Sequence, residues 1–274
     1  MPQLRKTPTQ ALGSVTSKSG LGVYASSDRL FRGAVFGRDS LEVADDLMLV
    51  KPRLVEKILI TIASLQGETN RPDNEEEPGK IIHEYRTPKV DGKPLNQTSQ
   101  EIYDRLSSMW GGDGSSLAYY GSVDSTPHFI KTLAVYCQNY GMEILTKQVK
   151  LRSGRMESLI IIMEDAIEWL CLHLEKSHSG LIEYHRKNPH GIENQVWKDS
   201  REFYIHKNGQ LANHRHPISS IEVQSLAYDA FILAAELLPS PRINCGSGLL
   251  NCSGCPNRIT SLWARTTMKR ISSG

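Results

Sequence analysis

The sequence predicts a mainly α-helical protein built from paired helices. Apolar residues recur at spacings of three and four in several long segments, as they do in amphipathic helices. The alternation of apolar and polar residues that is typical of strands is nearly absent, and its clearest instance is residues 203–205. Short connections alternate with very long polar ones. In an antiparallel array of helical hairpins every second loop emerges on the same face, so we expect the long loops to gather there and to carry the site.

Individual helices are predicted from this periodicity and from their caps. We expect helices over residues 39–52, 53–65, 126–140, 156–176 and 219–237, with a short one near 100–107. Two of these starts, at Asp39 and Ser219, have the spacing of a capping box. At a third, Thr126 is a candidate N-cap before Pro127 at the first helical position.

Length and composition exclude several classes of protein. The 274 residues can bury a real core, and 39% hydrophobic with 23% charged residues is ordinary globular chemistry. A net charge of +2 gives no strong field, so nucleic acid is not an expected partner. Apolar runs such as residues 159–163 are far shorter than the about 20 residues that span a bilayer, so no membrane partner is expected either. With no secretory signal and five cysteines, an odd number, we expect a cytoplasmic location.

The chain divides into three parts by its pattern. Residues 1–35 are predicted to be an irregular lead-in, residues 36–238 the helical body, and residues 239–274 an irregular tail with neither helical nor strand period. The tail contains Cys245, Cys252 and Cys255. A zinc site would need a fourth ligand and none follows, so we expect no metal and no other cofactor. A disordered tail and a stretch translated out of frame are the two alternatives for this segment.

Four polar segments on predicted loops hold the candidate chemistry. They are residues 36–40, 75–86, 119–127 and 181–200. Aromatic side chains interleave there with acids and amides. Sugars favour this mixture, because their C–H faces pack on aromatic rings while carboxylates, amides and Arg bind their hydroxyls. A glycosidase also needs two carboxyl groups flanking the scissile bond.

Structural roles would explain several of the same residues. Helix capping alone would account for Asp39, Asp124 and Glu222. Residues 75–77 are predicted to be a solvated loop rather than part of a site. His214 and His216 have no carboxylate at ligand spacing, which favours a polar loop over a metal site. Trp197 could be a core residue as well as a platform for a sugar.

Five ordered motifs resemble one enzyme family. They are GRDS at 37–40, EEPGKIIHEYR at 76–86, YYGSVDSTPHFI at 119–130, NQVWKDS at 194–200 and PISSIEVQSLAYDA at 217–230. Over residues 36–238 the chain resembles the catalytic region of bacterial glycogen-debranching-type glycoside hydrolases, the amylo-α-1,6-glucosidase group. That group belongs to the (α/α)6-barrel enzymes that include glucoamylases and mannosylglycerate hydrolases. The resemblance implies a partial (α/α)6 toroid of helical hairpins with long loops on the catalytic face.

The resemblance also implies roles for individual residues. It assigns substrate binding to Arg38, Asp39, Tyr120, Asp124, Asn194, Gln195, Trp197, Lys198, Glu222 and Gln224. Asp199 matches the general acid, and burial against Trp197 would favour its protonated form. Val196 and Ser225 stand where the group has Gly, and a β-branched Val196 that cannot take a positive φ cheaply would displace Asp199.

The resemblance covers only the first half of a catalytic domain. The family barrel has twelve helices, and no segment here matches the general base. The intact family member is expected to hydrolyse α-1,6 or α-1,4 glucosidic bonds of glycogen or oligosaccharides with inversion, whereas this chain is expected to be inactive or nearly so. The alternatives are a non-catalytic carbohydrate-binding half-barrel and a glycosidase for mannosylglycerate-like substrates. The expected partners are an oligosaccharide or polysaccharide and, through uncovered helix faces, further copies of the chain.

Overall fold

The computed structural model describes residues 7–238 except 19, 27–30 and 32, and it confirms a mainly α-helical protein. Over these residues the helices are α1 (Pro8–Val15), α2 (Gly37–Leu47), α3 (Pro52–Ser64), α4 (Gln97–Met109), α5 (Ser125–Tyr140), α6 (Leu159–Lys176) and α7 (Ile221–Leu237), with 3-10 turns at Met142–Thr146 and Arg201–Phe203. The cysteine-containing segment 239–274 lies outside the described residues. No helix of the described part is long and apolar enough to cross a membrane.

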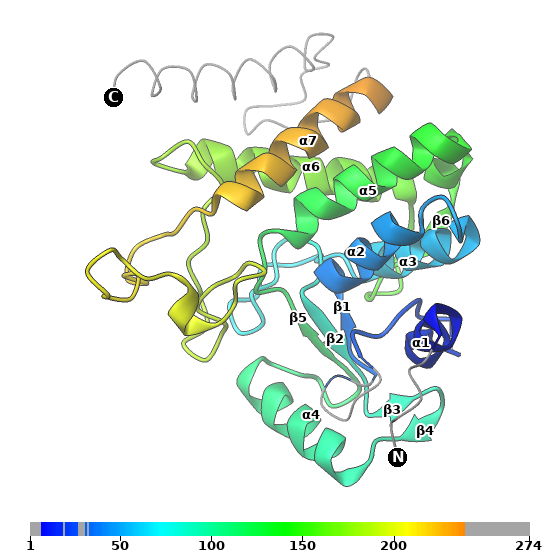
Figure 1. Cartoon of the computed structure of the whole chain (residues 1–274), viewed down its shortest axis with the longest axis horizontal. Helices are drawn as coiled ribbons and strands as arrows, with labels where there is room; N and C mark the ends of the chain where they lie inside the picture. Colours follow the sequence, from blue (N-terminus) through cyan, green and yellow to red (C-terminus); the bar gives the residue numbers. More distant parts are fainter. Residues whose placement is uncertain (1–6, 19, 27–30, 32, 239–274) are drawn as a thin grey trace.

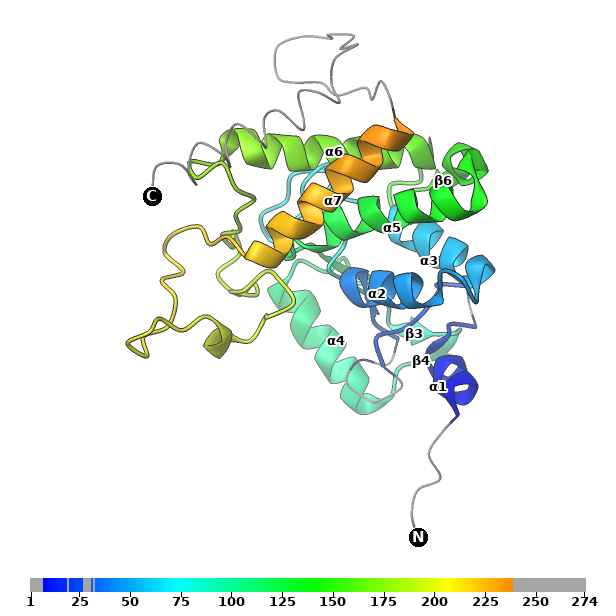
Figure 2. The same cartoon turned by 45° about the horizontal axis from the view of Figure 1, so that its top comes forward.

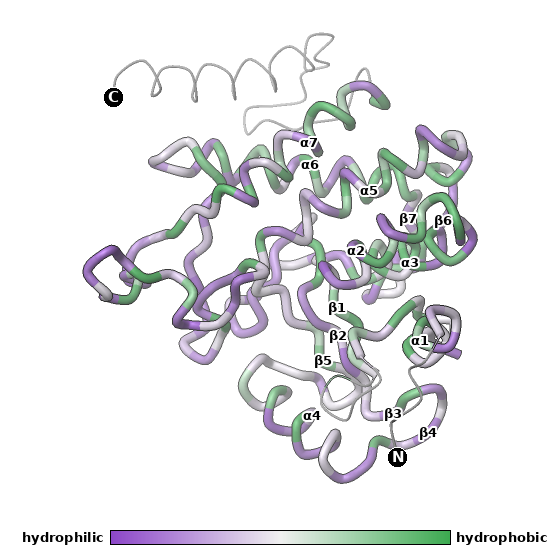
Figure 3. Tube along the Cα trace, in the orientation of Figure 1, coloured by the Kyte–Doolittle hydropathy of each residue, from purple (hydrophilic) through white to green (hydrophobic). Residues whose placement is uncertain are grey.

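The large helices pack in a consistent order. α5 lies against α2 on one side and α7 on the other, while α3 packs on α2 and α6 on α5. Figure 2 shows α2, α5 and α7 as successive neighbours. Their contact faces are buried and form most of one continuous apolar core. Figure 3 shows that hydrophilic residues dominate much of the long connection between α6 and α7.

Seven short strands form one three-stranded sheet and two hairpins over the described residues. β1 (Val35–Phe36), β2 (Glu84–Arg86) and β5 (Leu117–Tyr119) form an antiparallel sheet in the order β1-β2-β5, and two hairpins pair β3 (Lys89–Val90) with β4 (Lys93–Pro94) and β6 (Gln148–Lys150) with β7 (Met156–Ser158). In the sheet, Glu84 pairs with both Phe36 and Tyr119. The sheet therefore brings the first three motifs side by side. In Figure 1 the sheet lies between α4 on one side and the group formed by α2, α3, α5, α6 and α7 on the other.

Several predicted boundaries are wrong. α2 begins at Gly37, α5 at Ser125 and α7 at Ile221, and none of these helices has a hydrogen-bonded side-chain cap. The acids at these positions pair with basic side chains instead: Asp39 and Asp124 with Arg38, and Glu222 with Lys198. α6 begins at Leu159, because Met156–Ser158 belong to β7.

The prediction of an irregular lead-in is wrong for part of residues 1–35. Within the predicted irregular lead-in, α1 forms behind a capping box between Thr7 and Gln10. The alternation at residues 203–205 produces no strand, since Arg201–Phe203 form a 3-10 turn and Ile205 makes only an isolated bridge with Leu211.

Candidate functional site

The joint between β1 and α2 positions the first motif. The backbone N–H of Gly37 donates to the carbonyl of His83 at 3.0 Å. A Cβ at position 37 would lie 2.0 Å from the carbonyl oxygen of Ile82, so only glycine allows the two chains to approach this closely. This contact sets Arg38 and Asp39, on the first turn of α2, beside the start of β2.

Arg38 gathers three carboxylates from three segments. Its Nη1 lies 3.0 Å from Asp124 Oδ2, its Nε 3.8 Å from Asp39 Oδ1 and its Nη2 3.9 Å from Asp199 Oδ2. Arg38 and Asp124 are largely buried, whereas the side chains of Asp39 and Asp199 are 46% and 48% exposed. These four residues, called the Arg38 cluster below, thus have a buried ion pair and two solvent-facing carboxylates.

Asp124 is fixed on both oxygens. Ser122 Oγ donates to its Oδ1 at 2.6 Å, and Arg38 occupies its Oδ2. Asp124 stands at the N-cap position of α5, yet its side chain makes no cap hydrogen bond. The capping interpretation is therefore wrong for this side chain, which instead holds the Arg38 guanidinium in one orientation.

The surroundings of Asp39 change its acidity. Burial raises its pKa, Arg38 opposes that shift, and the like charges of Asp124 and Asp199 add to it. Its half-exposed side chain remains able to accept a hydrogen bond from a ligand hydroxyl. Asp39 lies inside the first turn of α2 and does not cap the helix.

The loop before Asp199 is held by Asn194. This buried amide donates from Nδ2 to the Ser200 carbonyl at 2.8 Å, and its Oδ1 accepts from the Tyr184 hydroxyl at 3.2 Å and contacts His214 Nε2 at 2.7 Å. These contacts occupy the side chain, so Asn194 positions the Asp199 loop instead of binding sugar directly. His214 is part of this polar loop.

The aromatic residue beside Asp199 faces solvent. Trp197 is 50% exposed, which rules out its interpretation as a core residue. Asp199 is not buried against it, so the burial expected to hold a proton on this carboxyl is absent. Lys198 Nζ lies 4.9 Å from the Trp197 ring centroid and 2.5 Å from Glu222 Oε1. That hydrogen bond, with one from Ser220, lowers the pKa of Glu222 to about 2.

Three further predicted binding residues have buried side chains outside the Arg38 cluster. Gln195 is buried and lines a separate hollow. Gln224 exchanges two hydrogen bonds of 2.9 Å with the backbone of Ile182 and also donates to the Ser220 carbonyl, so its amide braces the fold. Tyr120 is fully buried and donates to the carbonyl of Leu65 at 2.9 Å.

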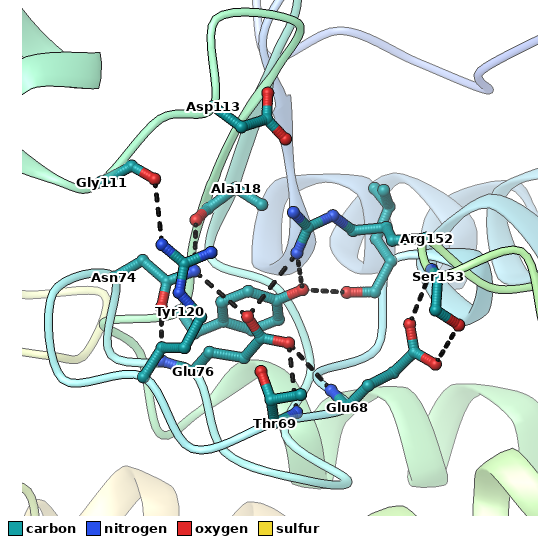
Figure 4. Close-up of polar contacts among 12 residues, drawn as sticks. Glu68, Thr69, Asn74, Glu76, Gly111, Asp113, Ala118, Tyr120, Arg152 and Ser153 are labelled. Atoms are coloured by element: carbon teal, nitrogen blue, oxygen red, sulfur yellow. Dashed lines mark hydrogen bonds and ion pairs between the residues drawn. The ribbon is translucent and has the colours of Figure 1, made fainter.

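Tyr120 belongs to a second polar cluster. Arg152 Nη1 donates to the Tyr120 hydroxyl at 3.1 Å and lies 3.7 Å from Glu76 Oε2. Figure 4 shows the Arg152 guanidinium in contact with both side chains and Asn74 hydrogen-bonded to Glu76. Glu75 and Glu76 are buried, so the prediction of a solvated loop over residues 75–77 is wrong for these two residues.

The substitutions expected to strain the site do not strain it. Val196 is buried without a positive φ, since the described non-glycine residues with positive φ are Glu75 and Asp91. Ser225 lies within α7, where its hydroxyl donates to the Ile221 carbonyl at 3.2 Å.

Sequence reasoning missed two buried groups next to the cluster. His83 packs edge-on between Phe36 and Tyr119, and burial together with the charges of Arg38 and Lys80 lowers its pKa to about 3. Glu84 forms a buried ion pair with Arg86, and burial raises its pKa. The signal was the polar HEYR run following the apolar pair Ile81 and Ile82.

Comparison with known proteins leaves the family open. No protein-family model matches the chain. No curated protein matches it either. Among the described residues, no three His, Cys, Asp or Glu side chains gather in a way that could hold a metal ion.

Proposed function

We propose that the chain is the sugar-holding part of an inverting α-glycosidase of the glycogen-debranching type. The observation that carries this proposal is the Arg38 cluster. One guanidinium meets carboxylates from three of the motifs on which the family resemblance depends. The exposed oxygens of Asp39 and Asp199 can accept from sugar hydroxyls, and Arg38 can donate.

The helix order supports the first half of an (α/α)6 toroid. In such a ring, inner helices neighbour one another and each is backed by an outer helix. α2, α5 and α7 are successive neighbours, with α3 backing α2 and α6 backing α5. The N-terminal ends of the inner helices carry Asp39, Asp124 and Glu222 respectively. Candidate site residues at one end of each inner helix are what a catalytic face requires.

In the reaction expected of the intact family member, the acid that Asp199 matches gives its proton to the glycosidic oxygen as the bond from that oxygen to the anomeric carbon breaks. A base removes a proton from water on the opposite face, and the water attacks with inversion. An inverting pair of carboxyl groups is separated by roughly 6.5–9.5 Å. No segment of the chain matches the motif of that base, so we expect binding to be strong relative to turnover.

A non-catalytic carbohydrate-binding module is the second candidate. The exposure of Asp199 favours it, because a general acid must retain its proton and burial is the usual means. A mannosylglycerate-type substrate is a third possibility within the enzyme class, since the cluster would hold a sugar ring generically.

The test is a substrate panel of maltose, isomaltose and mannosylglycerate, followed by proton NMR for both binding and the anomer released. We expect one glucoside to bind saturably, with β-glucose released in trace amounts at most. Any such release should be abolished in Asp199→Asn and retained in Asp46→Asn, an exposed carboxylate on the same helix as Asp39. Binding without any product selects the carbohydrate-binding module. Absence of binding to every sugar overturns both candidates.

A further inference from the structure

A second hollow, of about 300 Å³, lies between the 75–80 loop, the end of α6 and the 183–187 loop. Its lining contains no member of the Arg38 cluster. Among the lining residues are Lys80, Gln195, Glu75, Glu77, His173 and Lys187. This hollow is called the Lys80 pocket below, because a buried ammonium group forms part of its wall.

Within the described part of the chain Lys80 makes no close ion pair, although the charges of Glu77 and Glu75 act on its ammonium group from farther away. It is 2% exposed, and among the described residues no carboxylate oxygen lies within 4.0 Å of its Nζ. Its Nζ donates a hydrogen bond of 3.3 Å to the Glu75 carbonyl and lies over the ring of Trp169, 5.7 Å from the ring centroid. Burial lowers the pKa of Lys80 and the charges of Glu77 and Glu75 oppose this shift only in part, so an anion close to its Nζ would stabilise the ammonium group.

Gln195 offers a donor without an acceptor in the same wall. Its side chain is 2% exposed and its Nε2 has no hydrogen-bond acceptor among the described residues. Leaving a buried N–H group unpaired is unfavourable, and such a group in a native structure requires an explanation. An acceptor brought by a ligand would supply one.

The carboxylates of the pocket are already engaged. Glu77 accepts from Lys187 Nζ at 2.6 Å and from Trp169 Nε1 at 3.0 Å, and His173 Nε2 lies 3.4 Å away. Glu75 Oε1 accepts from the backbone N–H groups of Lys187 and Asn188 at 2.6 and 2.8 Å. Both acids therefore hydrogen-bond groups other than Lys80 Nζ, and the third acid of the lining, Glu183, accepts from the Ser179 hydroxyl. The Gln195 amide is left as a donor without an acceptor among the described residues.

We propose that the Lys80 pocket binds a small oxyanion, a phosphate or a carboxylate, with Lys80 Nζ as its counter-charge and Gln195 Nε2 as a second donor. Lys176, exposed on the rim, adds positive charge at the entrance. The site is distinct from the sugar site and does not depend on glycosidase activity.

Calorimetric titration with inorganic phosphate, and separately with acetate and succinate, tests the proposal on the full chain in Tris–chloride buffer. We expect saturable binding of at least one probe with a dissociation constant near or below about 1 mM. Gln195→Leu is expected to weaken binding about tenfold without lowering Tm, because it replaces an unpaired buried amide by an apolar group of similar size. Lys80→Met is expected to abolish binding, and Lys57→Met, an exposed lysine on α3, to leave it unchanged.

The separate titrations show which class of anion the pocket prefers. Saturation by phosphate alone indicates a phosphate site, and saturation by acetate or succinate alone indicates a carboxylate site. The proposal is overturned if no probe saturates, if Gln195→Leu binds as tightly as the unmodified chain, or if Lys57→Met weakens binding as much as the pocket variants. If Lys80→Met does not fold, Gln195→Leu still decides the question.

Discussion

Arg38 connects the interior of the protein to the candidate site. One side of its guanidinium meets Asp124, which is buried and bonded to Ser122, while the other meets the exposed Asp39 and Asp199. An arginine held this way presents donors in a fixed plane, which suits the recognition of sugar hydroxyls. The same buried contact gives the residue a structural role that can be measured without any ligand.

We expect Arg38→Met to lower the free energy of unfolding by about 3–5 kcal/mol, because it leaves the Asp124 carboxylate buried without its cation. Urea denaturation measures the loss. Arg53→Met, which removes an exposed arginine of α3, is the control and should have little effect. Adding Asp124→Asn to Arg38→Met should restore part of the stability; an Arg38→Met chain as stable as the control would show that the pair is not a buried ion pair in solution.

His83 makes stability depend on pH. Its pKa falls to about 3 in the folded chain, so between pH 6.5 and 3 the unfolded chain binds a proton that the folded chain does not. The stabilisation is therefore complete above pH 6.5 and is lost as the pH falls toward 3. His83→Phe keeps an aromatic ring between Phe36 and Tyr119, and should reduce the slope of unfolding free energy against pH in this window by about one proton. An unchanged slope would mean that His83 titrates normally.

At the scale of elements, the 3.6-residue period predicted the large helices, because each buries a broad apolar face. The starts of α2, α5 and α7 were predicted less well, since Asp39, Asp124 and Glu222 look like caps in sequence but bind Arg38 or Lys198. The β1-β2-β5 sheet has strands of two or three residues, too short to show a period.

The candidate site, like the helices, was predicted in part from the sequence. The ordered motifs predicted Arg38, Asp39, Asp124 and Asp199 as site residues, and these four side chains are in contact in the structure. Spacing alone could not reveal that the amide of Gln224 is occupied by Ile182, because that contact joins residues 42 positions apart.

The joint between β1 and α2 gives a prediction at this scale. Gly37→Ala would place a methyl group 2.0 Å from the Ile82 carbonyl, so the α2 terminus or the 81–83 segment must shift. We expect a loss of unfolding free energy of about 2 kcal/mol or more. Gly13→Ala in α1 meets nothing within 4 Å and should be neutral or stabilising by up to about 1 kcal/mol. Equal effects of the two substitutions in thermal or urea unfolding would contradict the close approach at Gly37.

At the scale of the whole molecule, α7 presents an apolar surface. Ile221 is 75% exposed and Tyr228 is partly exposed, and both line an open hollow with Leu181. In the proposed toroid this side of α7 would face the next helical hairpin. Exposed apolar surface of this kind favours association between copies.

We therefore expect light scattering to detect dimers or larger species at high protein concentration, and Ile221→Lys to shift the distribution toward monomer. Met156→Lys, which changes an exposed apolar residue of β7, is the matched control. A monodisperse monomer at all concentrations, or an equal response to both substitutions, would argue against association through α7.

The most direct test of the central claim is calorimetric titration of the chain with isomaltotriose, an α-1,6-linked glucose oligosaccharide. The Arg38 cluster predicts saturable binding that weakens about tenfold or more in Asp39→Asn, where a charged acceptor is lost, and stays unchanged in Asp46→Asn. A flat titration, or equal affinity of the Asp39→Asn variant and the unmodified chain, would contradict the assignment of this cluster as a sugar site.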